Sequence, residues 1–139
     1  MDCRTLRSIA ALSAAIACAG CAAGASDLQQ AQIACAGDRG SYRHLEVYVP
    51  RATVTRVLGF RSTRSGMHEG FLFTAAGSPS NVLVEDNTDI TGPIPLHRGQ
   101  TISLLGQYEC SDGVIHWTHR DPAGRHVSGY IEANGQRYQ

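Results

Sequence analysis

From Leu45 onward, apolar residues alternate with polar ones in short runs. This spacing is typical of β-strands that pack one face on a core. It predicts strands over residues 45–58, 68–75, 81–85, 101–109 and 114–119, a return strand over 126–131 and a closing strand over 136–138. Pro50 must lie at an edge or bend of the first strand, because proline cannot donate a ladder hydrogen bond. Residues 86–99, which contain two prolines, are expected to form an irregular crossover.

These elements predict a mainly β fold. Five or six short strands, internal glycines at Gly59 and Gly106 and one crossover before the fourth strand favour a small closed barrel. The order of elements is similar to an OB-fold in which the helix between the third and fourth strands is reduced to a loop. An open sandwich is the competing architecture, and neither architecture implies a function by itself.

The first 20 residues have the pattern of a bacterial export signal. Arg4 and Arg7 precede an apolar run that is too short to span a bilayer. The run ends in Cys18-Ala19-Gly20-Cys21, which resembles a lipobox with Cys18 in the place of the usual Leu. We therefore expect lipidation of Cys21 and a lipoprotein at the periplasmic side of the outer membrane. Cleavage before Ser26 would instead give a freely soluble periplasmic or secreted protein.

Beyond the signal, residues 21–44 are expected to form a tether and a short helix, and residues 45–139 the β domain. The helix is predicted over residues 27–36, with Ser26 or Asp27 as its N-cap and Gly37 as its stop.

Cys35 and Cys110 are the two cysteines that remain once the signal is removed and Cys21 is acylated. Two such thiols in an oxidising compartment predict one disulfide, and two buried free thiols are the alternative.

Charge narrows the range of partners. Twelve basic residues, all of them arginine, balance twelve acidic ones. Such a chain has no global field that draws in nucleic acid or an anionic membrane. Nucleic acid is therefore not indicated by net charge, and we expect contact with a membrane only through the N-terminal lipid.

The candidate functional site lies in residues 113–130, which hold three of the six histidines and the only tryptophan. Asp121-Pro122-Ala123-Gly124 has the composition of a β-turn. The sequence therefore predicts a hairpin in which His119 and His126 face each other and polar side chains are exposed at the tip. The candidate ligand-binding residues in this segment are His116, Trp117, His119, Arg120, Asp121, Arg125 and His126.

Several chemistries fit this segment. Arg120 and Arg125 suit an anion such as phosphate or carboxylate. A solvated ion pair between Asp121 and Arg125 within the turn is an equally good interpretation. Trp117 could stack on a base or a sugar, but a lone strand tryptophan usually lies in the core. His116 is expected to be a hydrogen-bonded histidine of the core or barrel face.

A metal site is not predicted. His116 and His119 should point to opposite faces of a strand, and so should not chelate one ion. A zinc set of His119, Asp121 and His126 would be more plausible geometrically, but it offers only one carboxylate and no cysteine. We assign no metal and no cofactor.

The chain also resembles a bacterial exported family catalogued as domain of unknown function 3465. The resemblance covers about residues 45–139 and rests on His-Trp-Thr-His at 116–119, on Asp-Pro-x-Gly-x-His at 121–126 and on the final Asn-Gly-Gln-Arg-Tyr-Gln. It adds His68 and Asn87 to the candidate ligand-binding residues, since both match family positions. The chain departs from the family pattern at Glu69, Asp86, Cys110 and Tyr130. The resemblance implies boundaries and a site, but no activity.

Three functions remain open. The leading hypothesis is an exported, lipid-anchored β-barrel that binds an anionic or polymeric ligand. The second is a hydrolase centred on His and Asp, with or without a metal, such as a phosphodiesterase or nuclease. The third is a structural envelope lipoprotein whose turn binds nothing.

Overall fold

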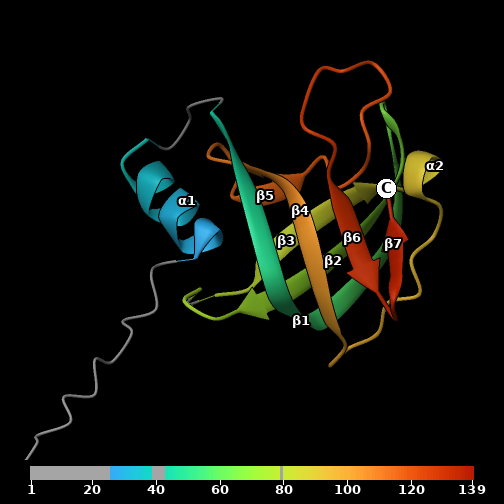
Figure 1. The fold of residues 1–139 in the computed structure, drawn as a ribbon, viewed down its shortest axis with the longest axis horizontal. Helices are drawn as coiled ribbons and strands as arrows, with labels where there is room; N and C mark the ends of the chain where they lie inside the picture. Colours follow the sequence, from blue (N-terminus) through green and yellow to red (C-terminus); the bar gives the residue numbers. More distant parts are fainter. Residues whose placement is uncertain (1–25, 39–42, 79) are drawn as a thin grey trace, which may run out of the picture.

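The computed structural model describes residues 26–38, 43–78 and 80–139 (Figure 1). Within these residues the elements are α1 (Asp27–Ala36), β1 (His44–Thr63), β2 (Gly66–Ala75), β3 (Val82–Asn87), α2 (Thr88–Thr91), β4 (Thr101–Glu109), β5 (Val114–His116), β6 (Tyr130–Ala133) and β7 (Gln136–Tyr138). None of the helices in this part of the chain has the length and apolar character needed to cross a membrane. The predicted export signal and Cys21 lie outside the described residues.

The strands pair in a ring. β1 is antiparallel to β2 through its second half and antiparallel to β4 through its first half. β2 is antiparallel to β3, β3 is parallel to β5, and β5 is antiparallel to β4, which leads back to β1. β6 pairs with β4 further along the same side, and β7 extends the sheet from β6. The predicted mainly β fold is confirmed.

β1 pairs with two neighbouring strands, and its register shifts along both pairings. Val47, Val49 and Val54 are buried in the core, as the alternating pattern predicts. Pairing with β4 shifts between Val49 and Ala52, next to Pro50, so the proline is accommodated without ending the strand. Pairing with β2 shifts twice more, the second time between Val57 and Gly59.

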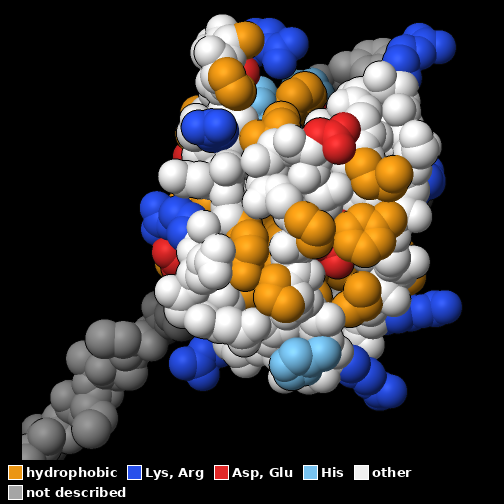
Figure 2. All heavy atoms as spheres, turned by 90° about the vertical axis from the view of Figure 1, so that its right-hand side faces the viewer, with side chains coloured by type: hydrophobic (Ala, Val, Ile, Leu, Met, Phe, Trp, Pro, Cys, Tyr) orange, Lys and Arg blue, Asp and Glu red, His pale blue; other side chains and the backbone are white. Residues whose placement is uncertain are grey.

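These shifts disturb the alternation in the second half of β1. Figure 2 shows apolar side chains gathered on the face that lies at the right of Figure 1. The exposed large apolar residues of β1 and β2 are Tyr48, Val57, Leu58, Phe60 and Met67. Adjacent Val57 and Leu58 are both exposed because a bulge breaks the inward–outward order.

The core fills the inside of the ring. Phe71 and Phe73 of β2 are completely buried there, with Leu104 of β4 and Ile115 of β5. Leu28 of α1 joins the same cluster. Every strand therefore has one face on a shared apolar interior, which is the main stabilising contact of the fold.

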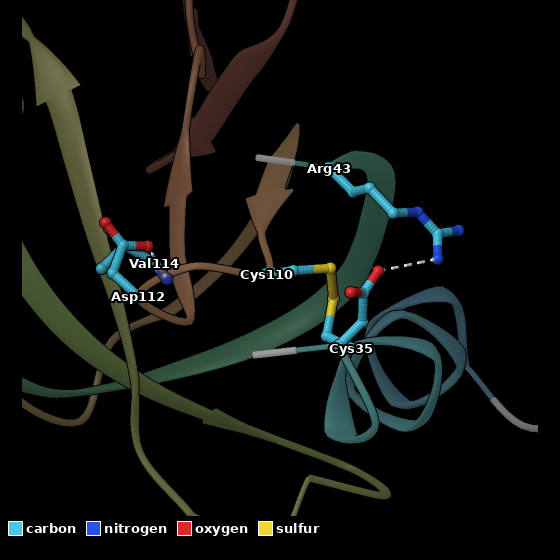
Figure 3. Close-up of a disulfide and its surroundings, with 6 residues drawn as sticks. Cys35, Arg43, Cys110, Asp112 and Val114 are labelled. Carbon is cyan, nitrogen blue, oxygen red and sulfur yellow. Dashed lines mark hydrogen bonds and ion pairs between the residues drawn. A yellow bond between two sulfur atoms is a disulfide. The ribbon is translucent and has the colours of Figure 1, made fainter. Parts of the chain in front are cut away.

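Helix α1 begins and ends where the sequence predicts. The hydroxyl of Ser26 accepts a hydrogen bond from the backbone N–H of Gln29, and Gly37 is the C-cap. The disulfide between Cys35 and Cys110, with Cα atoms 5.0 Å apart, fastens the last turn of the helix to the end of β4 (Figure 3). The predicted disulfide is confirmed.

Two expectations about the chain path are wrong. The crossover after β3 contains a single helical turn, α2, whose N-cap is the side chain of Asn87. The strand over 114–119 ends at His116, and its return begins only at Tyr130. β5 and β6 do not form a hairpin, since each pairs with β4 instead.

Candidate functional site

Most of the predicted site residues meet at one pocket of about 530 Å³. Its walls come from the end of β1 and the turn after it, from β2, β3 and α2, from the ends of β4 and β5, and from the loop over residues 117–129, which we name the site loop. The lining residues are Thr63, Ser65, His68, Glu85, Asn87, Ile90, Glu109, His116, Trp117, His119 and Arg125. Six of the nine candidate residues are in this set: His68, Asn87, His116, Trp117, His119 and Arg125.

Strand pairing explains part of this convergence. His68 and Asn87 are direct register partners on β2 and β3. Glu85 follows the residue of β3 that pairs with Ile115, so it lies beside His116 at the end of β5. The family positions His68 and Asn87 are thus adjacent to the His-Trp-Thr-His segment although they are far from it in sequence.

Trp117 ends β5 because its backbone adopts the left-handed conformation, with φ of 58°. This conformation is costly for a bulky side chain and is maintained only where surrounding contacts enforce it. Its ring centroid lies 4.4 Å from that of His126 and 6.0 Å from that of His119. The expectation of a core tryptophan is wrong: the side chain is half-buried and lines the pocket.

The turn at Trp117 also overturns the predicted alternation of the histidines. In a continuous strand His116 and His119 would point to opposite faces, but both line the same pocket. His116 is partly buried on the pocket wall, between carboxylates of Glu85 and Asp112, so of its two expected positions, core or barrel face, the core position is wrong.

His119 and His126 share one tautomer. Nδ1 of His119 lies 2.8 Å from the carbonyl oxygen of Arg120, and Nδ1 of His126 lies 2.8 Å from that of Val127. A carbonyl oxygen only accepts, so each Nδ1 carries a proton. In a neutral ring the lone pair is then on Nε2. Nε2 of His126 and Nδ1 of His68 are buried and have no hydrogen-bond partner among the residues that the structure describes.

The histidines are not exposed at a hairpin tip, as the sequence suggested. His119 is 7% exposed, and the side chain of His126 is 6% exposed. The physical reason is that the site loop folds back on the end of the sheet: the N–H of Gly129 donates to the carbonyl oxygen of His119. A Cβ at Gly129 would overlap the carbonyl oxygens of Trp117 and Leu105, so only glycine permits this approach.

Asp121 holds the site loop together from inside. Its carboxylate accepts hydrogen bonds from the backbone N–H groups of Ala123, Arg125 and His126. Desolvation acts to raise the pKa of Asp121, but these hydrogen bonds outweigh it and lower that pKa. The Arg125 Nε is 3.7 Å from this carboxylate. Asp121 is therefore foremost a backbone acceptor, and its ion pair with Arg125 is secondary.

The two arginines of the segment differ in position. Arg125 lines the pocket with a side chain that is 72% exposed, so its guanidinium can reach a ligand. Arg120 is exposed and does not line the pocket. Neither Asp121 nor His126 lines it. Asp121 holds the backbone of the site loop, and the ring of His126 packs against that of Trp117, so both shape the pocket indirectly.

Sequence reasoning missed the role of one buried acid, Asp86, which lies behind the pocket. Asp86 is fully buried and accepts hydrogen bonds from the hydroxyls of Thr118, at 2.7 Å, and Thr91. Burial raises the pKa of Asp86, although these hydrogen bonds act in the opposite direction. Its position after the apolar run of β3, where the family pattern has histidine, was the available signal.

Burial also lowers the pKa of His68, with Glu85 opposing this effect. His68 is therefore a neutral imidazole at physiological pH. Its Nε2 lies 3.0 Å from the hydroxyl oxygen of Ser65, also in the pocket wall.

A larger pocket of about 630 Å³ lies between α1 and the β4–β5 turn. Its lining is mostly amide, small and apolar, with Asp112 as its carboxylate and Tyr108 as its phenol. The chemistry of the chain is therefore concentrated in the smaller pocket.

A family model described as "Protein of unknown function (DUF3465)" matches residues 16–139. No curated protein and no solved structure matches the chain.

Proposed function

This chain belongs to the DUF3465 family, and we propose that it is an exported binding module whose ligand site is the pocket between His68, His116, His119, Trp117 and Arg125. The observation that carries the proposal is the convergence of polar residues from separate strands on one concave site. Pockets of this size with a few convergent polar groups are the usual form of small-ligand sites.

The pocket suits an anionic ligand with a planar or cyclic group. Its two carboxylates already have basic neighbours: Arg61 lies 2.5 Å from Glu85, and His44 lies 3.5 Å from Glu109. The guanidinium of Arg125 then faces the ligand with donor groups, and the ring nitrogens of the imidazoles donate only when they carry a proton. The half-buried ring of Trp117 offers a stacking surface.

Trp117 makes binding directly measurable, because it is the only tryptophan of the chain. We expect its fluorescence to change saturably on titration with an anionic polymer such as heparin or a short single-stranded oligonucleotide. Arg125→Ala should weaken the response, and added salt should weaken it further because exposed charges are screened. Arg98→Ala, which removes an exposed arginine outside the pocket, is the matched control.

A response that is equal in wild type, Arg125→Ala and His119→Ala would contradict the ligand pocket. It would favour the third hypothesis, a structural envelope protein. Circular dichroism of each variant would show that the fold is retained.

One observation favours a hydrolase as the second candidate. The buried carboxylate of Asp86 contributes to the electrostatic environment of both His68 and His119. Nδ1 of His119 faces the carbonyl oxygen of Arg120, so Nε2 is the ring nitrogen that would accept a proton from an attacking water. Turnover of bis-p-nitrophenyl phosphate that is lost in His119→Ala and retained in His97→Ala would establish this activity.

The same proposal includes the finer architecture and the location. The ring order β1-β2-β3-β5-β4, with α2 between β3 and β4, supports an OB-like barrel. Attachment through a lipid on Cys21 would place this barrel at the periplasmic side of the outer membrane.

A further inference from the structure

We propose that Glu109, Asp112 and His116 bind a divalent cation, with Zn²⁺ preferred over Mn²⁺ and Mg²⁺. Each residue offers one ligand atom, and the three atoms lie within 4.8 Å of one another. Among the described residues this is the group of His, Cys, Asp and Glu side chains whose ligand atoms come this close. The inference does not depend on the ligand proposed for the pocket.

The turn between β4 and β5 brings the three side chains together. The N–H of Gly113 donates to the carbonyl oxygen of Glu109, which closes the turn tightly. Oδ1 of Asp112 accepts a hydrogen bond of 3.0 Å from the N–H of Val114, as Figure 3 shows. This leaves Oδ2 directed toward the imidazole of His116, 3.8 Å from its Nε2.

The other side of the imidazole also has an acidic neighbour. Oε2 of Glu85 lies 4.0 Å from Nδ1 of His116. A carboxylate next to one ring nitrogen of a ligating histidine favours a proton on that nitrogen. The other ring nitrogen is then left to bind the metal. Glu85 lies on the Nδ1 side of His116, and a metal bound by Asp112 would lie on the Nε2 side. This is the order of a carboxylate–histidine–metal array.

The backbone that carries the three ligands is held in place, whereas one of the ligand side chains can move. Cys110, between two of the ligands, is fixed to α1 by the disulfide. Asp112 is about half exposed, whereas Glu109 and His116 are mostly buried. Tetrahedral zinc holds its ligands at about 2.0–2.2 Å, so the ligand atoms must draw closer together. The exposed Asp112 side chain is free to make that movement.

One imidazole and two carboxylates determine the cation preference. Imidazole suits zinc better than the hard cations Mg²⁺ and Ca²⁺, and affinity for a mixed nitrogen and oxygen site rises from Mn²⁺ to Zn²⁺. Three protein ligands leave a position open on the ion. Because Glu109 and His116 also line the pocket, that open position would lie at the pocket wall.

The test is calorimetric titration of the disulfide-bonded, untagged protein with ZnCl₂. The protein is first stripped of metal with a chelator, and the chelator is then removed. We expect a single saturable site in wild type. Asp112→Asn and His116→Ala should each weaken zinc binding by at least about tenfold. Asp112→Asn is the more informative variant, because its amide oxygen can still accept from Val114 and Asp112 does not line the pocket. Zn²⁺ should also raise Tm in wild type, since it binds the folded state.

Two exposed residues outside the cluster supply the controls. His97→Ala and Glu46→Gln remove the same kinds of groups and should bind zinc as wild type does. Equal zinc affinity in wild type, Asp112→Asn and His116→Ala would overturn the inference, as would the absence of saturable binding at millimolar zinc. If the wild type failed to bind zinc but still gave the Trp117 ligand response, only the cation site would be refuted.

Discussion

Asp86 is a fully buried carboxylate whose two oxygens accept hydrogen bonds from Thr118 and Thr91. Burial penalises its charged form more than these hydrogen bonds favour it, and its pKa is raised. Ionised Asp86 therefore lowers the stability of the folded protein. Its favourable contribution is complete below the unfolded-state pKa of about 3.9 and is lost as pH rises through the folded-state pKa.

Asp86→Asn removes this dependence while retaining an acceptor oxygen and a similar shape. We expect the Tm of the variant, relative to wild type, to increase as pH is raised from below 4 to above the folded-state pKa of Asp86. Thermal unfolding across a pH series measures the difference. A relative Tm that falls with pH would mean that the hydrogen bonds stabilise the carboxylate more than burial destabilises it.

Trp117 differs from the core aromatic residues in both burial and backbone. Phe71→Ala should lower the free energy of unfolding by about 3–5 kcal/mol, because Phe71 is fully buried. Trp117→Ala should cost less, since the ring is half-buried. Trp117→Gly should be no less stable than Trp117→Ala, because glycine adopts a φ of 58° without a steric penalty.

Urea unfolding of the three variants compares these costs. A Trp117→Ala loss equal to that of Phe71→Ala would show that the tryptophan acts as a core residue after all. A Trp117→Gly variant clearly less stable than Trp117→Ala would contradict the backbone argument.

At the scale of elements, α1 is attached to the sheet by both packing and a covalent bond. Leu28 and Ala31 are buried, and Cys35 is bonded to Cys110. The bond closes a loop with a sequence separation of 75 residues. In the chain-entropy treatment such a loop contributes up to about 4 kcal/mol, through restriction of the unfolded chain.

The double variant Cys35→Ser/Cys110→Ser should therefore unfold at lower urea concentration than wild type. Dithiothreitol should destabilise the wild type to a similar degree and leave the double variant unchanged. If reduction does not shift the wild-type midpoint, the disulfide does not contribute to stability in solution.

The sequence predicts the elements best where local pattern and tertiary packing agree. α1 and β4 begin and end at the predicted residues, because capping residues fix the helix and strict alternation fixes the strand. β5 is the clearest failure. Trp117 and Thr118 favour a strand locally, but the chain turns at Trp117, and the hydroxyl of Thr118 donates instead to Asp86 of β3, far away in the sequence.

The site was predictable as a segment, but not as a geometry. A concentration of His, Trp and Arg pointed to residues 113–130, and resemblance added His68 and Asn87. The contributions of Glu85 and Glu109 depend on strand pairing between distant segments. No local periodicity encodes that pairing, so these residues became visible only in the folded chain.

At the scale of the whole molecule, we propose that the residues before α1 determine where the protein is located in the cell. We expect Cys21→Ser to release it from the membrane into the soluble exported fraction, because serine cannot be lipidated at the lipobox position. Fractionation followed by immunoblotting measures the distribution.

Ala22→Ser, which leaves the cysteine in place, is the control and should remain with the membrane fraction. A Cys21→Ser variant that fractionates like wild type would refute the lipid anchor and favour the freely soluble exported form.

The position of the disulfide also determines how mechanical load would pass through the molecule. If the chain is tethered at its N-terminus while the pocket holds a polymer, tension enters through α1 and reaches Cys35. The sulfur bridge carries it to Cys110, a few residues before His116 and Trp117 in the pocket wall. This covalent route bypasses β1, β2 and β3. With the bond intact, tension between α1 and β5 does not have to pass along β1, and reduction of the bond would direct it through β1, where the chain next enters the sheet.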